Sequence, residues 1–114
     1  MENLDLYKRI CEAFGEESSC IENLDYVEVD GVKYTYAEES ELDTIDEGKY
    51  QYGGRVYAIG ELDETTGWDI KEVLFYVEQD FTQVGSYFSC QEREFEAPYI
   101  VEPVEVTVTE WKAV

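Results

Sequence analysis

Apolar and polar positions alternate most clearly between Tyr26 and Tyr36, where two β-branched and aromatic runs flank Asp30 and Gly31. An Asp-Gly pair in this setting predicts a two-residue hairpin, because a type I′ turn needs positive φ at both central positions. The turn sets the register, and one face of the hairpin is then apolar and the other charged. The expected cross-strand partners are Val29 with Val32, Val27 with Tyr34, and Glu28 with Lys33, the last as an ion pair.

Before the hairpin, apolar residues recur at three- and four-residue steps from Asn3 to Phe14. This period is typical of an amphipathic helix of about three turns. Asn3 is the expected N-cap and Gly15 the expected residue just past the end. The helix would cover one face of a sheet, and residues 16–25 would form a polar connection with one short turn.

After the hairpin, further strands are predicted from β-branched and aromatic residues bounded by turn residues. Gly53 and Gly54 are expected to bend the chain between two of them, and residues 62–69 to form a turn. The run 72–78 is apolar on both sides, so we expect it at the centre of the sheet, under the helix. Pro98 and Pro103 predict an edge or a crossing. The expected strands are 49–52, 55–61, 72–78, 81–84, 86–96 and 104–111.

These elements predict an α+β fold, in which one N-terminal amphipathic helix packs on a mostly antiparallel sheet of six or seven strands. A chain of 114 residues and 13.2 kDa is long enough for one core, so residues 1–114 are expected to be a single domain. The oligomeric state does not follow from the sequence.

The net charge is the feature of the sequence that bears most on function. The chain carries 28 Asp and Glu against 8 Lys and Arg, a formal net charge of −20. DNA, RNA and anionic membranes are negatively charged and bind protein surfaces rich in Lys and Arg, so none of them is an expected partner. We expect a basic partner, specifically a nucleic-acid-binding protein such as a nuclease, a methyltransferase or a CRISPR effector.

Two groups of acids are the candidate partner-binding residues. The first falls in residues 37–48, read as a loop or a frayed helical turn, and could equally be a solvated connection. The second alternates along the predicted strand 86–96, where three carboxylates would share one face at spacings of roughly 6.6 Å. The candidate residues are Glu38, Glu39, Glu41, Asp43, Asp46, Glu47, Glu92, Glu94 and Glu96.

Catalysis, metal binding and cofactor binding have little support. The chain has no His, so acid-base chemistry would fall to carboxylates, Tyr or Lys, and no position is marked out; we expect a protein that is not an enzyme. Cys11, Cys20 and Cys90 lack metal-ligand spacing and are expected to be reduced thiols. No cofactor motif is present, and neither a signal peptide nor a membrane span is apparent, which predicts a cytoplasmic protein.

The C-terminal half, residues 68–111, contains the runs W-D-I-K-E-V-L-F-Y-V, V-G-S-Y-F-S and Y-I-V-E-P-V-E-V-T-V-T-E-W. These runs resemble the sequences of small acidic accessory proteins of tailed phages. By charge, the protein is similar to phage-encoded DNA-mimic inhibitors of the anti-restriction and anti-CRISPR type. The resemblance implies a protein that occupies the nucleic-acid channel of a host defence enzyme, with carboxylates in place of phosphates.

Two alternatives stay open. The protein could be a phage structural or assembly accessory whose acidity serves solubility, which predicts scattered carboxylates and an exposed apolar patch or sheet edge. It could also be adapted to high salt, although 20 Glu against 8 Asp and many large aromatic residues fit that reading poorly.

Overall fold

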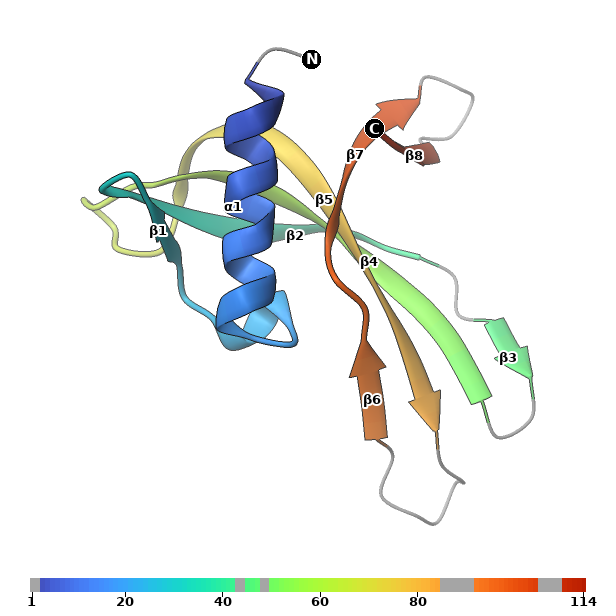
Figure 1. The fold of residues 1–114 in the computed structure, drawn as a ribbon. Coiled ribbons are helices and arrows are strands. Elements are labelled where there is room, and N and C mark those ends of the chain that lie inside the picture. Colours follow the sequence, from blue (N-terminus) through green and yellow to red (C-terminus); the bar gives the residue numbers. More distant parts are fainter. Residues whose placement is uncertain (1–2, 43–44, 48–49, 85–91, 105–109) are drawn as a thin grey trace.

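The computed structural model describes residues 3–42, 45–47, 50–84, 92–104 and 110–114. A helix, α1, comes first, and a short 3₁₀ helix precedes the strands (Figure 1). The helices are α1 (Leu4–Glu17) and the 3₁₀ helix (Ile21–Asn23). The strands are β1 (Val27–Val29), β2 (Val32–Glu41), β3 (Ile45–Glu47), β4 (Tyr50–Leu62), β5 (Ile70–Val84), β6 (Glu92–Phe95), β7 (Tyr99–Val104) and β8 (Glu110–Ala113).

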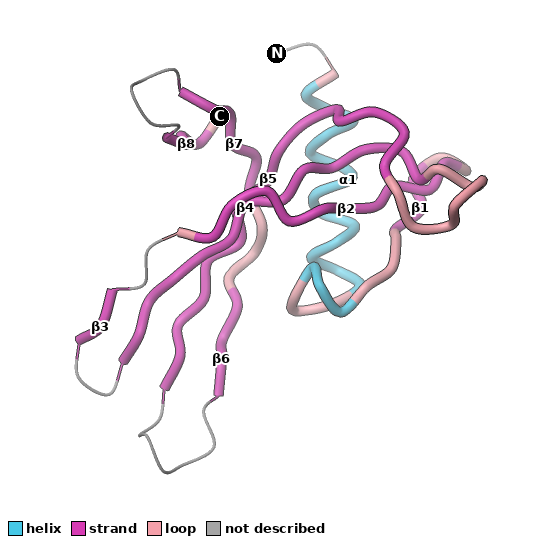
Figure 2. Tube along the Cα trace, turned by 180° about the vertical axis from the view of Figure 1, so that it is seen from behind, coloured by secondary structure: helices cyan, strands magenta, loops and turns pink. Residues whose placement is uncertain are grey.

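The eight described strands form one antiparallel sheet in the order β1-β2-β4-β5-β7-β8, with β3 paired to β4 and β6 paired to β5. The long strands β4 and β5 run through the whole sheet. α1 covers one face at one end, and the other end is an arm of β3, β4, β5 and β6 that projects away from the helix (Figures 1 and 2). The predicted α+β class, with a helix packed on an antiparallel sheet, is confirmed.

The predicted hairpin is confirmed in turn and in register. Asp30 and Gly31 have φ angles of 53° and 80°, as a type I′ turn requires. The Cα partners are Val27 with Tyr34, Glu28 with Lys33, and Val29 with Val32. The expected ion pair is wrong in its partner, because the Lys33 ammonium lies 4.0 Å from Glu64 instead of reaching Glu28.

The core lies between α1 and the sheet. Tyr7 stacks on Phe75 of β5 with ring centroids 4.4 Å apart, and Ile10 and Phe14 are almost fully buried. These positions recur at three- and four-residue steps, so the predicted amphipathic face is the buried one. Within the described residues, no helix is long and apolar enough to cross a membrane.

The predicted ends of α1 need correction. Asn3 is the N-cap position, but it has a left-handed backbone (φ 61°) and makes no side-chain capping hydrogen bond. Gly15 does not end the helix, which continues to Glu17 and is followed by an extended Ser18. A Cβ on Gly15 would lie 3.5 Å from Pro98, an ordinary contact, so the helix needs no glycine there for steric reasons.

The acid run after the hairpin is not the expected loop over its whole length. β2 continues to Glu41, because residues 37, 38, 40 and 41 pair with β4 around a register shift at Glu39, and β3 follows after a short gap. Gly53 and Gly54 do not bend the chain either; they lie inside the continuous strand β4. A Cβ on Gly53 would lie 2.8 Å from the Phe81 ring, so glycine serves close packing between β4 and β5.

The C-terminal predictions are confirmed in part. β5 is central, as expected for the run 72–78, and extends to residue 84. Of the predicted strand 86–96, residues 86–91 lie outside the described residues and β6 covers 92–95. The predicted strand 104–111 is not one strand: Val104 ends β7 and pairs with Glu110 of β8, so the chain reverses between them. Pro103 lies within β7, opposite Trp111.

Candidate functional site

Most basic residues of the described chain are held by neighbouring acids. Five of the seven described Lys and Arg lie within 4.0 Å of a carboxylate oxygen. A sixth, Arg93, donates to Gln83 and lies over the Phe81 ring. The ion pairs are Arg9 with Asp30, Lys33 with Glu64, Arg55 with Glu22 and Glu38, Lys71 with Glu61, and Lys112 with Glu102.

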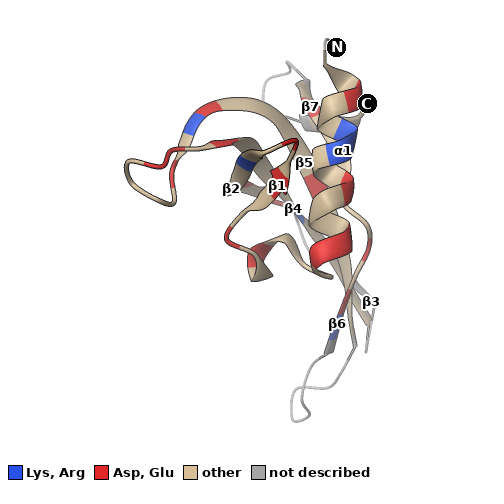
Figure 3. Ribbon diagram, turned by 60° about the vertical axis from the view of Figure 1, so that its left-hand side comes forward, with Lys and Arg blue, Asp and Glu red and all other residues tan. Residues whose placement is uncertain are grey.

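Acids outnumber bases in the described chain, with 25 Asp and Glu against seven Lys and Arg. Figure 3 shows acidic positions on α1, on both hairpins of the covered half and on the connection to β7, with few basic positions among them. Because nearby acids already engage the bases, the field that an approaching molecule meets is negative. The electrostatic potential over the described surface is therefore more favourable for cations than for anions.

The first group of predicted residues is on β2 and β3. Glu38, Glu39 and Glu41 are exposed on β2. Glu38 and Glu41 have Cα partners on β4 that place them on the face of the sheet covered by α1. Asp43 lies outside the described residues, and for Asp46 and Glu47 only the position on β3 is described.

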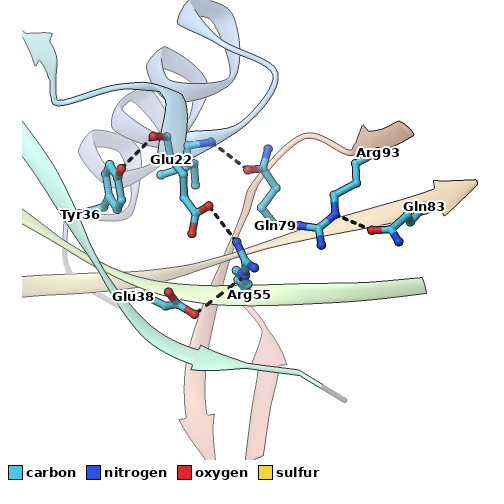
Figure 4. A network of polar contacts seen from close by, with 8 residues as sticks. Glu22, Tyr36, Glu38, Arg55, Gln79, Gln83 and Arg93 are labelled. Atoms are coloured by element: carbon cyan, nitrogen blue, oxygen red, sulfur yellow. Dashed lines mark hydrogen bonds and ion pairs between the residues drawn. The ribbon is translucent and has the colours of Figure 1, made fainter. Parts of the chain in front are cut away.

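Glu38 is partly neutralised where it lies. Arg55 of β4 reaches Glu22 of the 3₁₀ helix at 2.8 Å and Glu38 at 3.9 Å, and so joins β2 to the segment before β1 (Figure 4). Half of the Glu38 side chain remains exposed. It is therefore a weaker candidate for partner binding than Glu39 and Glu41.

The second predicted group is at the opposite edge of the sheet. Glu94 of β6 is exposed and shares a face with Thr82 and Tyr52, the face opposite to that of Glu38 and Glu41. Glu92 is described only by its backbone position, opposite Val84. β4 and β5 lie between the two groups, so Glu39 and Glu41 of β2 do not form one cluster with Glu94 of β6.

Glu96 belongs to a groove that the sequence did not predict. It follows β6, and with Glu12 and Glu16 of α1 it lines a groove of about 360 Å³ between the helix and the connection to β7. Glu12 and Glu16 are four residues apart and therefore lie on the same side of the helix. We call Glu12, Glu16 and Glu96 the acidic groove. The available signal was the i, i+4 spacing of two acids on the polar side of the amphipathic helix.

A buried glutamine holds the walls of the acidic groove together. The Gln79 side chain accepts from the backbone N–H of Ile21 at 3.0 Å and donates to the carbonyls of Ser19 and Glu96 at 2.9 and 3.0 Å. These bonds join β5, the segment after α1 and the β6–β7 connection, and Figure 4 shows the bond that Gln79 accepts from the backbone N–H. The position of Glu96 relative to α1 is thereby fixed by the fold.

A separate carboxyl pair lies on the face of β5 that points away from α1. Tyr99 of β7 is hydrogen-bonded to Glu78 and lies 3.1 Å from Asp80 Oδ2. Burial, and then the hydrogen bond with Asp80, raises the pKa of Glu78 to about 7. The Tyr99 hydroxyl donates to the carboxylates, and near neutral pH a proton on Glu78 allows Glu78 and Asp80 to share a hydrogen bond without repulsion between two charges.

This pair is a closed network with its polar atoms satisfied by one another. Shared protons are found in catalytic carboxylate pairs, but a catalytic pair also needs a substrate cleft beside it. Asp80 reaches a shallow groove with Tyr52 and Glu96, whereas Glu78 is buried under Tyr99. The network joins β5 to β7 and is better explained as structural.

The described cysteines are buried thiols, and the described residues contain no metal-binding group of side chains. Cys11 and Cys20 are buried and free, and burial raises the pKa of the Cys11 thiol to about 11. Cys90 lies outside the described residues. The described part of the chain holds no group of three or more His, Cys, Asp or Glu side chains arranged to bind a metal ion.

No protein-family model matches the sequence, and neither the curated proteins nor the solved structures gave a match.

Proposed function

We propose that this protein is a non-enzymatic acidic binding protein, encoded by a phage and acting in the host cytoplasm. It would inhibit a host nucleic-acid-binding defence enzyme by presenting carboxylates in place of phosphates. The partner would be a basic protein, such as a nuclease, a methyltransferase or a CRISPR effector. The observation that carries the proposal is the local pairing of most described bases, which leaves the exposed acids in excess.

The physical basis is electrostatic. A channel that binds a row of phosphates gains energy by releasing counterions, and a surface rich in carboxylates can replace the phosphates. The acidic groove is the best-placed candidate contact, because Gln79 holds one of its walls rigidly. Glu39, Glu41 and Glu94 would supply further contacts from the sheet edges.

The test is a pull-down from a bacterial lysate at low and high salt, followed by competition with duplex DNA. Recovery of one basic nucleic-acid enzyme, released both by salt and by DNA, would support mimicry. Two triple variants with the same change in charge locate the surface: Glu12, Glu16 and Glu96 to Gln, and Glu38, Glu39 and Glu41 to Gln.

If the acidic groove is the main contact, the first triple variant should lose much more affinity than the second, which removes only the further contacts of Glu39 and Glu41. Its affinity should also depend less steeply on salt, because three carboxylates that attract a basic partner are removed. Equal and small losses in both variants would indicate diffuse attraction and would contradict a defined mimic surface.

The alternative is a phage structural or assembly accessory protein. Two observations favour it: the predicted acids of β2 and β6 lie apart, with β4 and β5 between them, and Val73, Leu74 and Trp68 are exposed. Self-association through this apolar surface, measured by sedimentation at increasing concentration, would support the accessory role, particularly if the pull-down recovers no basic enzyme.

A further inference from the structure

A groove with aromatic walls lies at the end of the sheet farthest from the arm. It has a volume of about 580 Å³ and lies between the segment that enters β1, strand β2, and the turn that joins β4 to β5. Tyr26 and Trp68 supply aromatic rings, and Asp25 and Glu64 supply carboxylates. We call these four residues and Lys33 the aromatic groove.

Trp68 is unusually exposed for a tryptophan. Its relative exposure is 74%, the highest of the exposed large hydrophobic residues in the described chain, and Tyr26 is 43% exposed. Neither ring is needed to fill the core. Tryptophan and tyrosine dominate binding energy at protein interfaces, so a matched pair of exposed rings in a groove indicates a contact surface.

The turn that carries Trp68 is held in place by its own hydrogen bonds. Asp63 N–H donates to the Asp69 carbonyl at 2.7 Å, and Gly67 N–H donates to the Asp63 carbonyl at 2.8 Å. The Asp63 carboxylate accepts from Thr65 N–H at 2.9 Å, and Asp69 N–H donates to a threonine hydroxyl. Trp68 is thus presented from an ordered turn, which reduces the entropy cost of binding.

The groove already holds a cation of its own. The Lys33 ammonium lies 5.1 Å from the centre of the Tyr26 ring and 4.0 Å from Glu64. One cationic side chain therefore meets an aromatic face and a carboxylate together. Asp25 brings a second carboxylate to the groove, so its charge is acidic even with Lys33 in place.

We propose that the aromatic groove receives an arginine side chain of a basic partner protein. A guanidinium is planar, so it can lie flat on the Trp68 ring and bind a carboxylate with two parallel hydrogen bonds, which an ammonium cannot do. Asp25 and Glu64 are the carboxylates within the groove. The inference rests on the proposed function for the basic character of the partner, and adds a site and a preferred side chain.

The test isolates the groove from the natural partner. In a Trp111→Phe background Trp68 is the sole tryptophan, and its fluorescence is titrated with an arginine decapeptide and with a lysine decapeptide of equal charge. We expect the arginine peptide to change Trp68 emission and to bind about tenfold more tightly. Trp68→Ala and Tyr26→Ala, followed by calorimetry, should each lose that preference.

The matched control is Tyr52→Ala, which removes a similarly exposed tyrosine from the opposite end of the sheet. It should keep the preference for arginine, and circular dichroism should show that all variants are folded. Equal affinity for both peptides, or an unchanged preference in Trp68→Ala, would overturn the inference.

Those results differ from a failure of the proposed function. If the lysate pull-down recovers no basic enzyme while Trp68 still selects arginine, the proposed function fails and the groove stands. If a basic enzyme is recovered and Trp68→Ala binds it normally, the groove inference fails and the proposed function stands.

Discussion

At the scale of single residues, the clearest consequence of the fold is the proton on Glu78. Its pKa is raised from 4.5 to about 7 in the folded protein, chiefly by burial. Between these two values the folded state keeps a proton that the unfolded state has lost, so this group makes stability fall as pH rises from about 4.5 to 7. Above that range its effect is constant.

Glu78→Gln should remove this pH dependence, because an amide keeps a neutral polar group next to Tyr99. Below pH 4.5 the variant and the original protein should be similarly stable, and near pH 8 the variant should be more stable by about 1–2 kcal/mol. Urea unfolding at a series of pH values measures this difference. Glu94→Gln, at an exposed position, is the control, and a difference independent of pH would contradict the assignment.

The sequence alone could give only part of this network. Glu78 ends the predicted strand 72–78 and Asp80 lies beyond it, so their shared face follows only from the continuous β5 of the structure. Tyr99 reaches them only because β7 pairs with β5, with Tyr99 as the Cα partner of Glu78. A contact set by non-local pairing has no local signal, and so the raised pKa could not be assigned in advance.

At the scale of elements, Gly15 tests why α1 ends where it does. The glycine lies inside the last turn of the helix, and an added Cβ would make only an ordinary contact with Pro98. Gly15→Ala should therefore stabilise the protein by about 0.5–1 kcal/mol, because alanine loses less backbone entropy on forming helix. Gly31→Ala is the opposite control.

Gly31 has φ of +80° with open space around it, so its substitution should destabilise through the backbone alone. Urea unfolding of both variants measures the change in the free energy of unfolding, which should rise for Gly15→Ala and fall for Gly31→Ala. Destabilisation by Gly15→Ala would show that the helix end needs glycine after all.

Elements with a local cause could be predicted, and elements with a tertiary cause could not. Asp30 and Gly31 specify their turn whatever surrounds them, so the hairpin and its register are correct. The glycines of β4 look like a bend in sequence, but Phe81 packs over Gly53 and the strand runs straight on. β2 stays paired with β4 through its acidic residues up to Glu41. The strand persists because β4 supplies the hydrogen-bonding partners and Arg55 offsets part of the charge of Glu38.

At the scale of the whole molecule, composition predicted the excess of acid but not its arrangement. Of the predicted residues, Glu38 and Glu41 of β2 lie on one face of the sheet and Glu94 of β6 on the other, with β4 and β5 between the two strands. The acidic groove instead joins α1 to the β6–β7 connection, two segments about 80 residues apart in sequence. Only the pairing order of the strands brings them together.

The net charge of −20 also sets how the fold responds to salt. The molecule measures 44 × 34 × 25 Å, so most like-charge pairs are farther apart than the Debye length of about 10 Å at 0.1 M salt. Salt should screen this long-range repulsion more than it weakens ion pairs with N···O distances between 2.5 and 4.0 Å. The folded state should therefore gain stability as salt increases.

Raising NaCl from about 0.02 M to about 0.5 M should increase the melting temperature, by roughly 4 °C for each kcal/mol of repulsion that is screened. Calorimetry or circular dichroism measures the shift, and KCl at equal ionic strength separates screening from ion-specific binding. A fall in melting temperature would mean that local ion pairs outweigh the net repulsion. An unfolded chain at low salt, recovered only near molar salt, would instead support adaptation to high salt and would remove the need for a basic partner to explain the acidity.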